Sequence, residues 1–297
     1  MMSDAVIRKA TTDDRHKVAE LCRDALLPID VVDPAWLDRV VWDSDGISGS
    51  VAVVSGELVG AVFGSVKVEH SGTVAGAMTL LCVREDRRCQ GLGSGLVAEM
   101  ESAMKKSGAT EVWTGGGQPR FWWPGIDSTS AEVLSFFVHR GYELDDDAVN
   151  MRVDLSTADL EPREPNNVDL HRLTAAEWPK FLEWMELSWD DPWSEEVESV
   201  LQRQPVSCFV AKRAGEYIGF AAYDTNRRGW FGPMGSRPDA RGTGIGGELL
   251  RLCLRDYVDQ GREDCEIGWV GPLNFYENAV GATVARKFSR LRKGLQP

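Results

Sequence analysis

The pattern of hydrophobic and polar positions along this 297-residue chain predicts a similar order of strands and helices in each half. Apolar residues that alternate or run together predict strands, and apolar residues three or four apart predict helices. In the first half the expected strands are 6–9, 50–54, 58–66, 74–83, 111–114, 141–144 and 148–155, and the expected helices are 12–27, 35–41, 92–106 and 128–140. In the second half the expected strands are 168–173, 208–212, 217–223, 265–270, 282–293 and one ending at Met234, and the expected helices are 175–188, 195–202 and 246–260.

A break in this pattern at residues 156–167 separates the two halves. The segment has prolines at 162 and 165 and several charged residues, which is typical of a linker. A chain of this length with 43% hydrophobic residues can bury two cores of about 150 residues each. We therefore expect an α/β fold with mixed sheets, divided into an N-terminal domain at 1–155, a linker at 156–167 and a C-terminal domain at 168–297.

The stretch Gly232–Leu254 has the clearest chemical signature. A strand ends at Met234, a loop rich in Gly and Arg follows, and a helical pattern begins near Gly246. The glycines at 242, 244, 246 and 247 allow backbone N–H groups to converge on an anion at the positive end of the helix dipole. Neither the phosphate-loop nor the dinucleotide spacing is present. The pattern favours a pyrophosphate site, although such loops also occur as simple turns.

The same signature appears once before, in residues 78–97. Gly91 and Gly244 are 153 positions apart (244 − 91 = 153), about half the chain. Two matches between a strand and a helix, separated by a domain length, indicate a tandem duplication.

Composition narrows the functional class. The formal net charge is −13, which argues against nucleic acid as a partner and favours a cationic small molecule, unless the acidity serves only solubility. No window is apolar enough for a membrane span, and the charged residues Asp4, Arg8 and Lys9 do not suit a signal peptide, so we expect a cytoplasmic protein. Six cysteines without a C-x-x-C pair and four scattered histidines support no metal site.

The loop Arg241-Gly-Thr-Gly244-Ile-Gly246 resembles the acetyl-CoA loop of the GCN5-related N-acetyltransferases, and Arg88-Cys-Gln-Gly91-Leu-Gly93 resembles it as well. The resemblance implies that acetyl-CoA is the cofactor and that backbone amides hold its pyrophosphate. It also implies that the strand around Pro233 bonds the pantetheine. The implied cofactor-binding residues are Pro233, Met234, Arg241, Gly242, Thr243, Gly244, Ile245, Gly246, Gly247 and Asn274 in the second copy, and Arg88, Gln90, Gly91, Leu92 and Gly93 in the first.

The same resemblance suggests roles in catalysis. Tyr276, in the run Phe275-Tyr276-Glu277 at the start of a helix, matches the tyrosine that protonates the departing thiolate in this family. The first copy has Phe137 at that place, and phenylalanine has no proton to give. We therefore expect catalysis in the second copy, and a first copy that either binds acetyl-CoA without this chemistry or keeps its loop only for the fold. Glu266 and Asp224 are the candidates for the general base.

Two segments suggest an acceptor site. Asp190 and Asp191 lie between the first two helices of the second copy, where they either bind a cationic amine or form a turn. Trp122 and Trp123, in the aromatic insertion at residues 115–127, either stack on a sugar ring or fill a domain interface.

Two further runs stand out beside the tandem copies: P-x-F-W-W-P-G at 119–125, and W-F-G-P-M-G at 230–235 followed by G-W-V-G-P-L-N-F-Y-E-N-A-V-G-A at 268–282. With these runs, the whole chain resembles the glucosamine and glucosaminide N-acetyltransferases. That implies a small-molecule acceptor, the 2-amino group of an amino sugar. A reaction like that of mycothiol synthase, and an acyl-CoA-binding module without catalysis, are the alternatives. The oligomeric state stays open.

Overall fold

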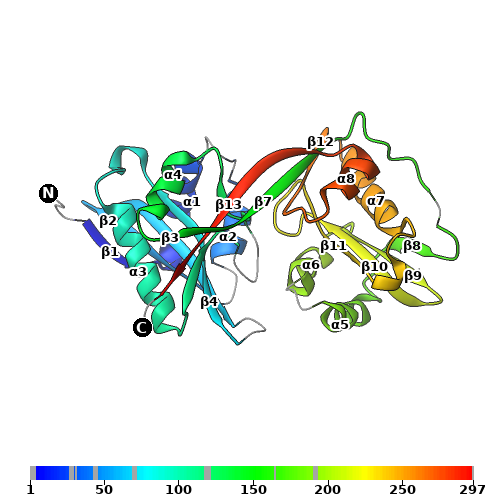
Figure 1. Ribbon diagram of the computed structural model, residues 1–297, viewed down its shortest axis with the longest axis horizontal. Helices are drawn as coiled ribbons and strands as arrows, with labels where there is room; N and C mark the ends of the chain where they lie inside the picture. The colour runs from blue at the N-terminus through cyan, green and yellow to red at the C-terminus, as the bar shows by residue number, and fades with distance from the viewer. Residues whose placement is uncertain are drawn as a thin grey trace. The chain divides into compact units, whose positions relative to one another are not determined.

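The computed structural model describes residues 5–26, 30, 32–42, 46–68, 72–116, 122–163, 165–189 and 193–295 (Figure 1). The chain divides into two compact units. Unit 1 contains Met1–Ala148 together with Phe288–Pro297, and unit 2 contains Val149–Lys287. In the part that is described, no helix is long and apolar enough to cross a membrane.

Unit 1 is built on a mixed sheet. Its strands, in spatial order, are β1 (Ala5–Lys9), β2 (Ile47–Val54), β3 (Glu57–Val68), β4 (Val74–Val83), β5 (Glu111–Thr114) and the end of β13 (Thr283–Gly294), which also pairs with β6 (Ile126–Asp127). Only the β4–β5 pair is parallel among these. Apolar residues on both sides of the strands account for helices on both faces.

The helices of unit 1 form two layers. Helices α1 (Arg15–Leu26) and α2 (Pro34–Val41) share one core with Phe63 of β3 and Leu80 of β4. Helices α3 (Leu92–Lys106) and α4 (Ala131–Val138) share the opposite core with Val62 and Met78. The neighbours Val62 and Phe63 of β3 thus enter different cores, as the period of two requires. In β4, Met78 and Leu80 enter different cores although they are two positions apart, because the β3–β4 register is irregular at this point.

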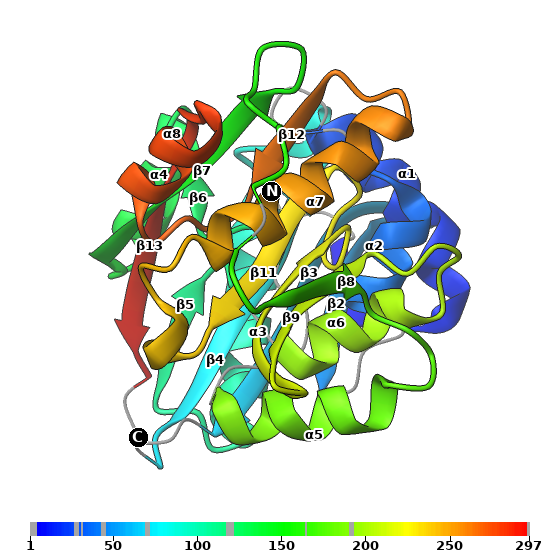
Figure 2. The same cartoon turned by 90° about the vertical axis from the view of Figure 1, so that its right-hand side faces the viewer.

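Unit 2 repeats this plan. Its strands, in spatial order, are β7 (Glu143–Asp154), β12 (Asp264–Ile267), β11 (Trp230–Ser236), β10 (Glu216–Tyr223), β9 (Cys208–Arg213) and β8 (Asp169–Arg172). Here β11–β12 is the parallel pair. Helices α7 (Ile245–Asp259) and α8 (Leu273–Val280) cover one face, and α5 (Trp178–Ser188) and α6 (Trp193–Leu201) cover the other (Figures 1 and 2). The predicted α/β fold with mixed sheets is confirmed.

The unit bounds differ from those predicted by the sequence. The residues expected as two short strands form the single strand β7, and its end at 151–154 pairs with β12 inside unit 2. Conversely, the end of β13 belongs to unit 1, where Arg292 lies opposite Trp113 of β5. The expected linker at 156–167 falls within unit 2. A strand's own pattern shows its two faces but not the sheet that it joins.

Candidate active site

The glycine-rich loop of unit 2 has an open backbone geometry. Gly242 and Gly244 adopt positive φ angles of 74° and 87°, which glycine adopts without steric cost. Helix α7 begins immediately after Gly244, and no side chain caps its N-terminus. Residues 241–244 are exposed, whereas Ile245 is buried below them. The first N–H groups of the helix therefore face a position where an anionic group fits.

The loop of unit 1 has a closely similar backbone. Gly91 has φ 85°, and α3 begins directly after it, again without a side-chain cap. A Cβ built on Gly93 would lie 3.4 Å from Phe136, and one built on Gly246 would lie 3.4 Å from Phe275. The two loops thus sit in matching positions against their following helices, and both fit a pyrophosphate.

The arginines distinguish the two loops. Arg88 donates from Nε to the carbonyl of Val83 at 3.1 Å and from Nη2 to that of Ala25 at 3.3 Å. Its guanidinium thus joins the loop to α1. The guanidinium of Arg241 is exposed and has no hydrogen-bond or ion-pair partner within the residues that the structure describes. The loop of unit 2 consequently offers a guanidinium to an anion, while that of unit 1 uses its arginine internally.

Other arginines near the loops are paired. Arg84 contacts both Asp86 and Glu57, and Arg237 contacts Asp239 at 3.0 Å. In the first loop Gln90 donates to the carbonyl of Asp86 at 3.1 Å. These pairings reduce the positive charge that the sequence suggested for both loops.

The parallel strands before each loop separate at matching positions. In unit 2 the β11–β12 register ends at Phe231 opposite Ile267, and in unit 1 the β4–β5 register ends at Met78 opposite Thr114. Beyond Phe231 the described pairing of β11 is with β10, where Met234 lies opposite Ala221. One edge of β11 therefore has no β12 partner around Pro233 and Met234, which is the splayed strand that the sequence predicts.

Tyr276 lies on α8, next to this splay. It is 7% exposed and packs edge-on against Phe231 of β11 at 6.2 Å between ring centroids. Its hydroxyl makes no hydrogen bond to the residues described. Burial raises the pKa of Tyr276 well above its usual value, so the phenol keeps its proton at neutral pH. A protonated hydroxyl with no hydrogen-bond partner among these described residues is suited to donate a proton.

Phe137 takes the matching place in unit 1. It lies on α4, is buried, and packs edge-on against its neighbour Phe136 at 5.1 Å, as Tyr276 does against Phe275 at 4.8 Å. Unit 1 therefore has the same ring packing at this position as unit 2, but it lacks the phenolic hydroxyl of Tyr276.

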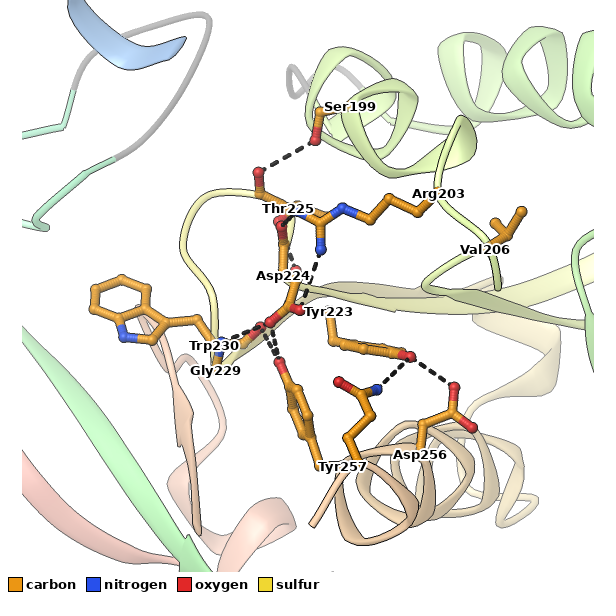
Figure 3. A network of polar contacts seen from close by, with 12 residues as sticks. Ser199, Arg203, Val206, Tyr223, Asp224, Thr225, Gly229, Trp230, Asp256 and Tyr257 are labelled. Atoms are coloured by element: carbon orange, nitrogen blue, oxygen red, sulfur yellow. Dashed lines mark hydrogen bonds and ion pairs between the residues drawn. The ribbon is translucent and has the colours of Figure 1, made fainter. Parts of the chain in front are cut away.

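Asp224 is held inside a network of hydrogen bonds (Figure 3). Its Oδ1 accepts from the hydroxyl of Tyr257 and from the backbone N–H of Gly229, both at 2.6 Å. Its Oδ2 accepts from Arg203 Nη1 at 3.1 Å. Both carboxylate oxygens of Asp224 thus accept hydrogen bonds that hold the loop between β10 and β11 in place. This argues for a structural role of Asp224 instead of the predicted role as general base.

Glu266 lies on the other side of the sheet from Tyr276. Ile267 enters the core beneath α7 and α8, so the adjacent Glu266 faces the side of α5 and α6. Its Oε1 accepts from Asn150 Nδ2 at 2.6 Å and lies 3.8 Å from Arg286 Nη1. The splay therefore has a proton donor on one face of the sheet and a carboxylate on the other.

The structure places Trp122 in the core of unit 1, beside α2. It is 1% exposed, meets Trp36 edge-on and stacks on Trp123, each at 4.2 Å. Trp123 donates from Nε1 to Asp30 Oδ2 at 2.9 Å. A ring enclosed in this way has no open face for a sugar, so the predicted stacking role of Trp122 does not fit. Asp190 and Asp191 lie outside the described residues.

Sequence reasoning missed Arg251, which connects the parts of the site. Its guanidinium forms a buried ion pair with Glu248 at 2.6 Å and donates to the carbonyl of Ala279 on α8 at 3.1 Å. It thus fixes the helix of the glycine loop relative to the helix of Tyr276. Its place on the buried face of α7, where arginine is rare, is the signal that the sequence offered.

A family model described as "Acetyltransferase (GNAT) family" matches residues 18–120 and 170–280 of this chain. The two matches together cover more than half of the sequence, one in each unit. The chain belongs to the GNAT acetyltransferase family.

Several solved structures share the tandem fold. A GCN5-related glucosamine N-acetyltransferase region of a fungal multi-domain GH3 β-N-acetylglucosaminidase aligns with a TM-score of 0.82 and 17% identity, over 99% of this chain and 38% of that one. A GCN5-related N-acetyltransferase from Sphaerobacter thermophilus aligns with a TM-score of 0.73 and 19% identity, over 100% and 98%. A tandem GNAT protein from the clavulanic acid biosynthesis pathway aligns with a TM-score of 0.73 and 16% identity, over 99% of both chains.

Among curated proteins, an uncharacterized N-acetyltransferase from Archaeoglobus fulgidus is 32% identical over 87 residues. The aligned part is 26% of this chain and 56% of that relative. The solved structures, at 16–19% identity, show the GNAT fold alone. Their alignment over nearly the whole chain agrees with the two matches of the family model.

Proposed function

We propose that this GNAT protein transfers an acetyl group from acetyl-CoA to a primary amine, with the reaction carried out in unit 2. The observation that supports this most is the conjunction, in one unit, of an uncapped glycine loop, a splayed β11 and a protonated Tyr276. Unit 1 has the loop and the splay but lacks the hydroxyl, so we propose that it is degenerate in catalysis.

The backbone of residues 242–247 would hold the pyrophosphate, and Arg241 would add a charge to it. Thr243 supports the loop by donating from its hydroxyl to the carbonyl of Ala240 at 2.6 Å. Asn274, exposed in the first turn of α8, would lie at the same end of the site. When bound, acetyl-CoA supplies the thioester from which the acetyl group leaves.

The chain's own groups would then divide the proton transfers. Tyr276 would give its phenolic proton to the sulfur as the carbon–sulfur bond breaks, and the acceptor nitrogen would form the new bond to the acetyl carbon. Glu266, on the opposite face, remains our candidate for accepting the proton that the amine loses. The two faces of the sheet would thus serve the leaving group and the incoming amine separately.

For the acceptor we propose the 2-amino group of glucosamine or of a glucosaminide. The resemblance of the sequence to glucosaminide N-acetyltransferases supports it, as does the solved glucosamine N-acetyltransferase region that shares the tandem fold over nearly the whole chain.

The test is a panel of amines with acetyl-CoA, in which released thiol is measured and products are identified by mass. We expect amino sugars to give the highest kcat/KM. Cofactor binding without transfer to any amine would contradict the proposal and leave an acyl-CoA-binding module. Higher kcat/KM for an unrelated amine would contradict the proposed acceptor alone.

A further inference from the structure

Asn150 of β7 is completely buried, and both ends of its side-chain amide form hydrogen bonds. Its Nδ2 atom donates to Oε1 of Glu266 on β12 at 2.6 Å, and its Oδ1 atom accepts from the backbone N–H of Trp269 at 2.8 Å. A backbone N–H can only donate, so Oδ1 must face Trp269 and Nδ2 must face Glu266. The amide is therefore a fixed hydrogen-bond donor to the carboxylate that we propose as the general base.

The second of these hydrogen bonds holds the turn that follows β12. Trp269 has a φ angle of 49°, in the left-handed region that bulky residues rarely adopt. The next residue, Val270, donates from its backbone N–H to the carbonyl of Val149 at 2.9 Å. Beyond β12 the chain thus bonds to β7, on the side away from β11. Asn150 therefore connects the proposed base to the start of the segment that leads to α8.

The position of Glu266 makes its orientation important. It lies opposite Trp230, one residue before the β11–β12 register ends, and its side chain is 23% exposed, so a small molecule can reach it. The Nη1 atom of Arg286 lies 3.8 Å from the same Oε1 atom, whereas Asn150 Nδ2 lies 2.6 Å from it. Of these two contacts, the one with the buried amide is the short hydrogen bond that directs the carboxylate.

Unit 1 has different residues at the matching positions. By the strand registers, Trp113 of β5 takes the place of Glu266, and Arg290 of β13 takes the place of Asn150. The guanidinium of Arg290 lies over the ring of Trp113 at 4.7 Å. The turn after β5 contains Gly116 with φ 62°, which glycine adopts without steric cost. The pair of a carboxylate and a buried amide thus occurs in the unit that also has the tyrosine hydroxyl.

We propose that Asn150 is a positioning residue for the reaction, whose amide holds the Glu266 carboxylate in the orientation that accepts the proton of the amine. An ionised carboxylate only accepts hydrogen bonds, so a fixed N–H donor selects one of its orientations. A small misplacement of a reacting group lowers the rate strongly. The inference rests on the proposed function, since it assigns a support to the proposed base.

The experiment is a double-mutant cycle of Asn150→Asp and Glu266→Gln. Asn150→Asp keeps the shape of the side chain and the acceptor for the N–H of Trp269, but it replaces the donor to Glu266 with a second carboxylate oxygen. In the double variant the pair is inverted, because the introduced glutamine can donate to the introduced aspartate. Asn166→Asp, at an exposed position of unit 2, controls for the added charge. Thiol release is measured with the amine that gives the highest kcat/KM in the panel, and stability is measured by urea unfolding.

We expect Asn150→Asp to lower kcat/KM for the amine about 10- to 100-fold, the usual effect of losing a hydrogen bond to a charged group. In the Glu266→Gln background the same change should alter kcat/KM by less than about twofold, because the carboxylate that the amide positions is already gone. The double variant should recover part of the stability lost in Asn150→Asp without recovering turnover. Asn166→Asp should match the wild type. A purely structural role of Asn150 would lower kcat/KM by the same factor in both backgrounds.

An equal loss of kcat/KM in both backgrounds, or wild-type turnover in a folded Asn150→Asp protein, would overturn the inference and leave the proposed acetyl transfer intact. Wild-type turnover in Glu266→Gln would overturn it as well, because Asn150 would then hold a carboxylate that accepts no proton. If the wild-type protein transfers acetyl to no amine, the proposed function fails and the inference fails with it. If Asn150→Asp does not fold, Asn150→Ala replaces it in the same cycle, with the same loss expected in the wild-type background alone.

Discussion

Replacing Tyr276 with Phe removes one hydroxyl and keeps the ring. Because this hydroxyl makes no hydrogen bond to the described residues, the free energy of unfolding should change by less than about 0.5 kcal/mol. If the hydroxyl protonates the thiolate, kcat should fall by about 10² to 10⁴, which corresponds to roughly 3–5 kcal/mol in the barrier. The affinity for acetyl-CoA should stay nearly constant, because the proton is needed only as the leaving group departs.

Tyr257→Phe is the matched control. Tyr257 is also buried, but its hydroxyl donates to Asp224 at 2.6 Å and lies 3.1 Å from the carbonyl of Trp230. Its loss should cost about 1–3 kcal/mol of stability, since a buried carboxylate loses a donor. Tyr276→Phe should therefore lose turnover and keep its stability, whereas Tyr257→Phe should lose stability.

The assay is thiol release at saturating acetyl-CoA, with single-turnover measurements to verify that chemistry limits the rate. Stability is measured by urea unfolding. A folded Tyr276→Phe protein that retains wild-type turnover under these conditions would refute the assignment. Since burial raises the pKa of Tyr276, its ionisation should produce no fall in kcat below about pH 10.

Two further predictions concern differences between the units, and a third concerns an ion pair within unit 1. Gly244→Glu should abolish acetyl-CoA binding in unit 2 and nearly all turnover, while Gly91→Glu should leave part of the turnover. Calorimetry measures the binding and thiol release measures the turnover. The reverse ranking of the two variants would place catalysis in unit 1. Arg241→Ala should weaken acetyl-CoA binding about 5- to 10-fold without changing stability, whereas Arg88→Ala should lower the stability of unit 1. Equal effects of the two variants on acetyl-CoA binding would contradict the difference between a guanidinium offered to the cofactor and one bonded within the protein. The hydrogen bond from Arg8 lowers the pKa of Asp14 to about 2, so this carboxylate stabilises unit 1 above about pH 4 and the gain is lost as pH falls towards 2. Asp14→Asn should therefore cost about 2 kcal/mol at pH 7 and little near pH 2 in urea unfolding, and a cost that does not vary with pH would contradict this.

Much of the fold and part of the site follow from local sequence alone. The strand Val74–Val83 and the strand Glu111–Thr114 have the bounds that their apolar patterns predict. The glycine loops were recognisable because positive φ angles and uncapped helix starts depend on residues within a few positions of each other. Tyr276 and its counterpart Phe137 became candidates in the same way, by their place in a short motif after a strand, and the role of Tyr276 stays a prediction.

The tertiary structure alone decided what depends on distant partners. The sequence leaves Trp122 either to stack on a sugar ring or to fill a domain interface, but Trp36, 86 positions earlier (122 − 36 = 86), packs against it in the core of unit 1. Arg88 and Arg241 occupy equivalent motif positions, and only the carbonyls around Arg88 reveal that its charge is used internally. Asn150 meets Glu266 across 116 residues of chain. Local patterns determine backbone conformation, whereas the availability of a charge or a ring depends on the side chains that folding brings against it.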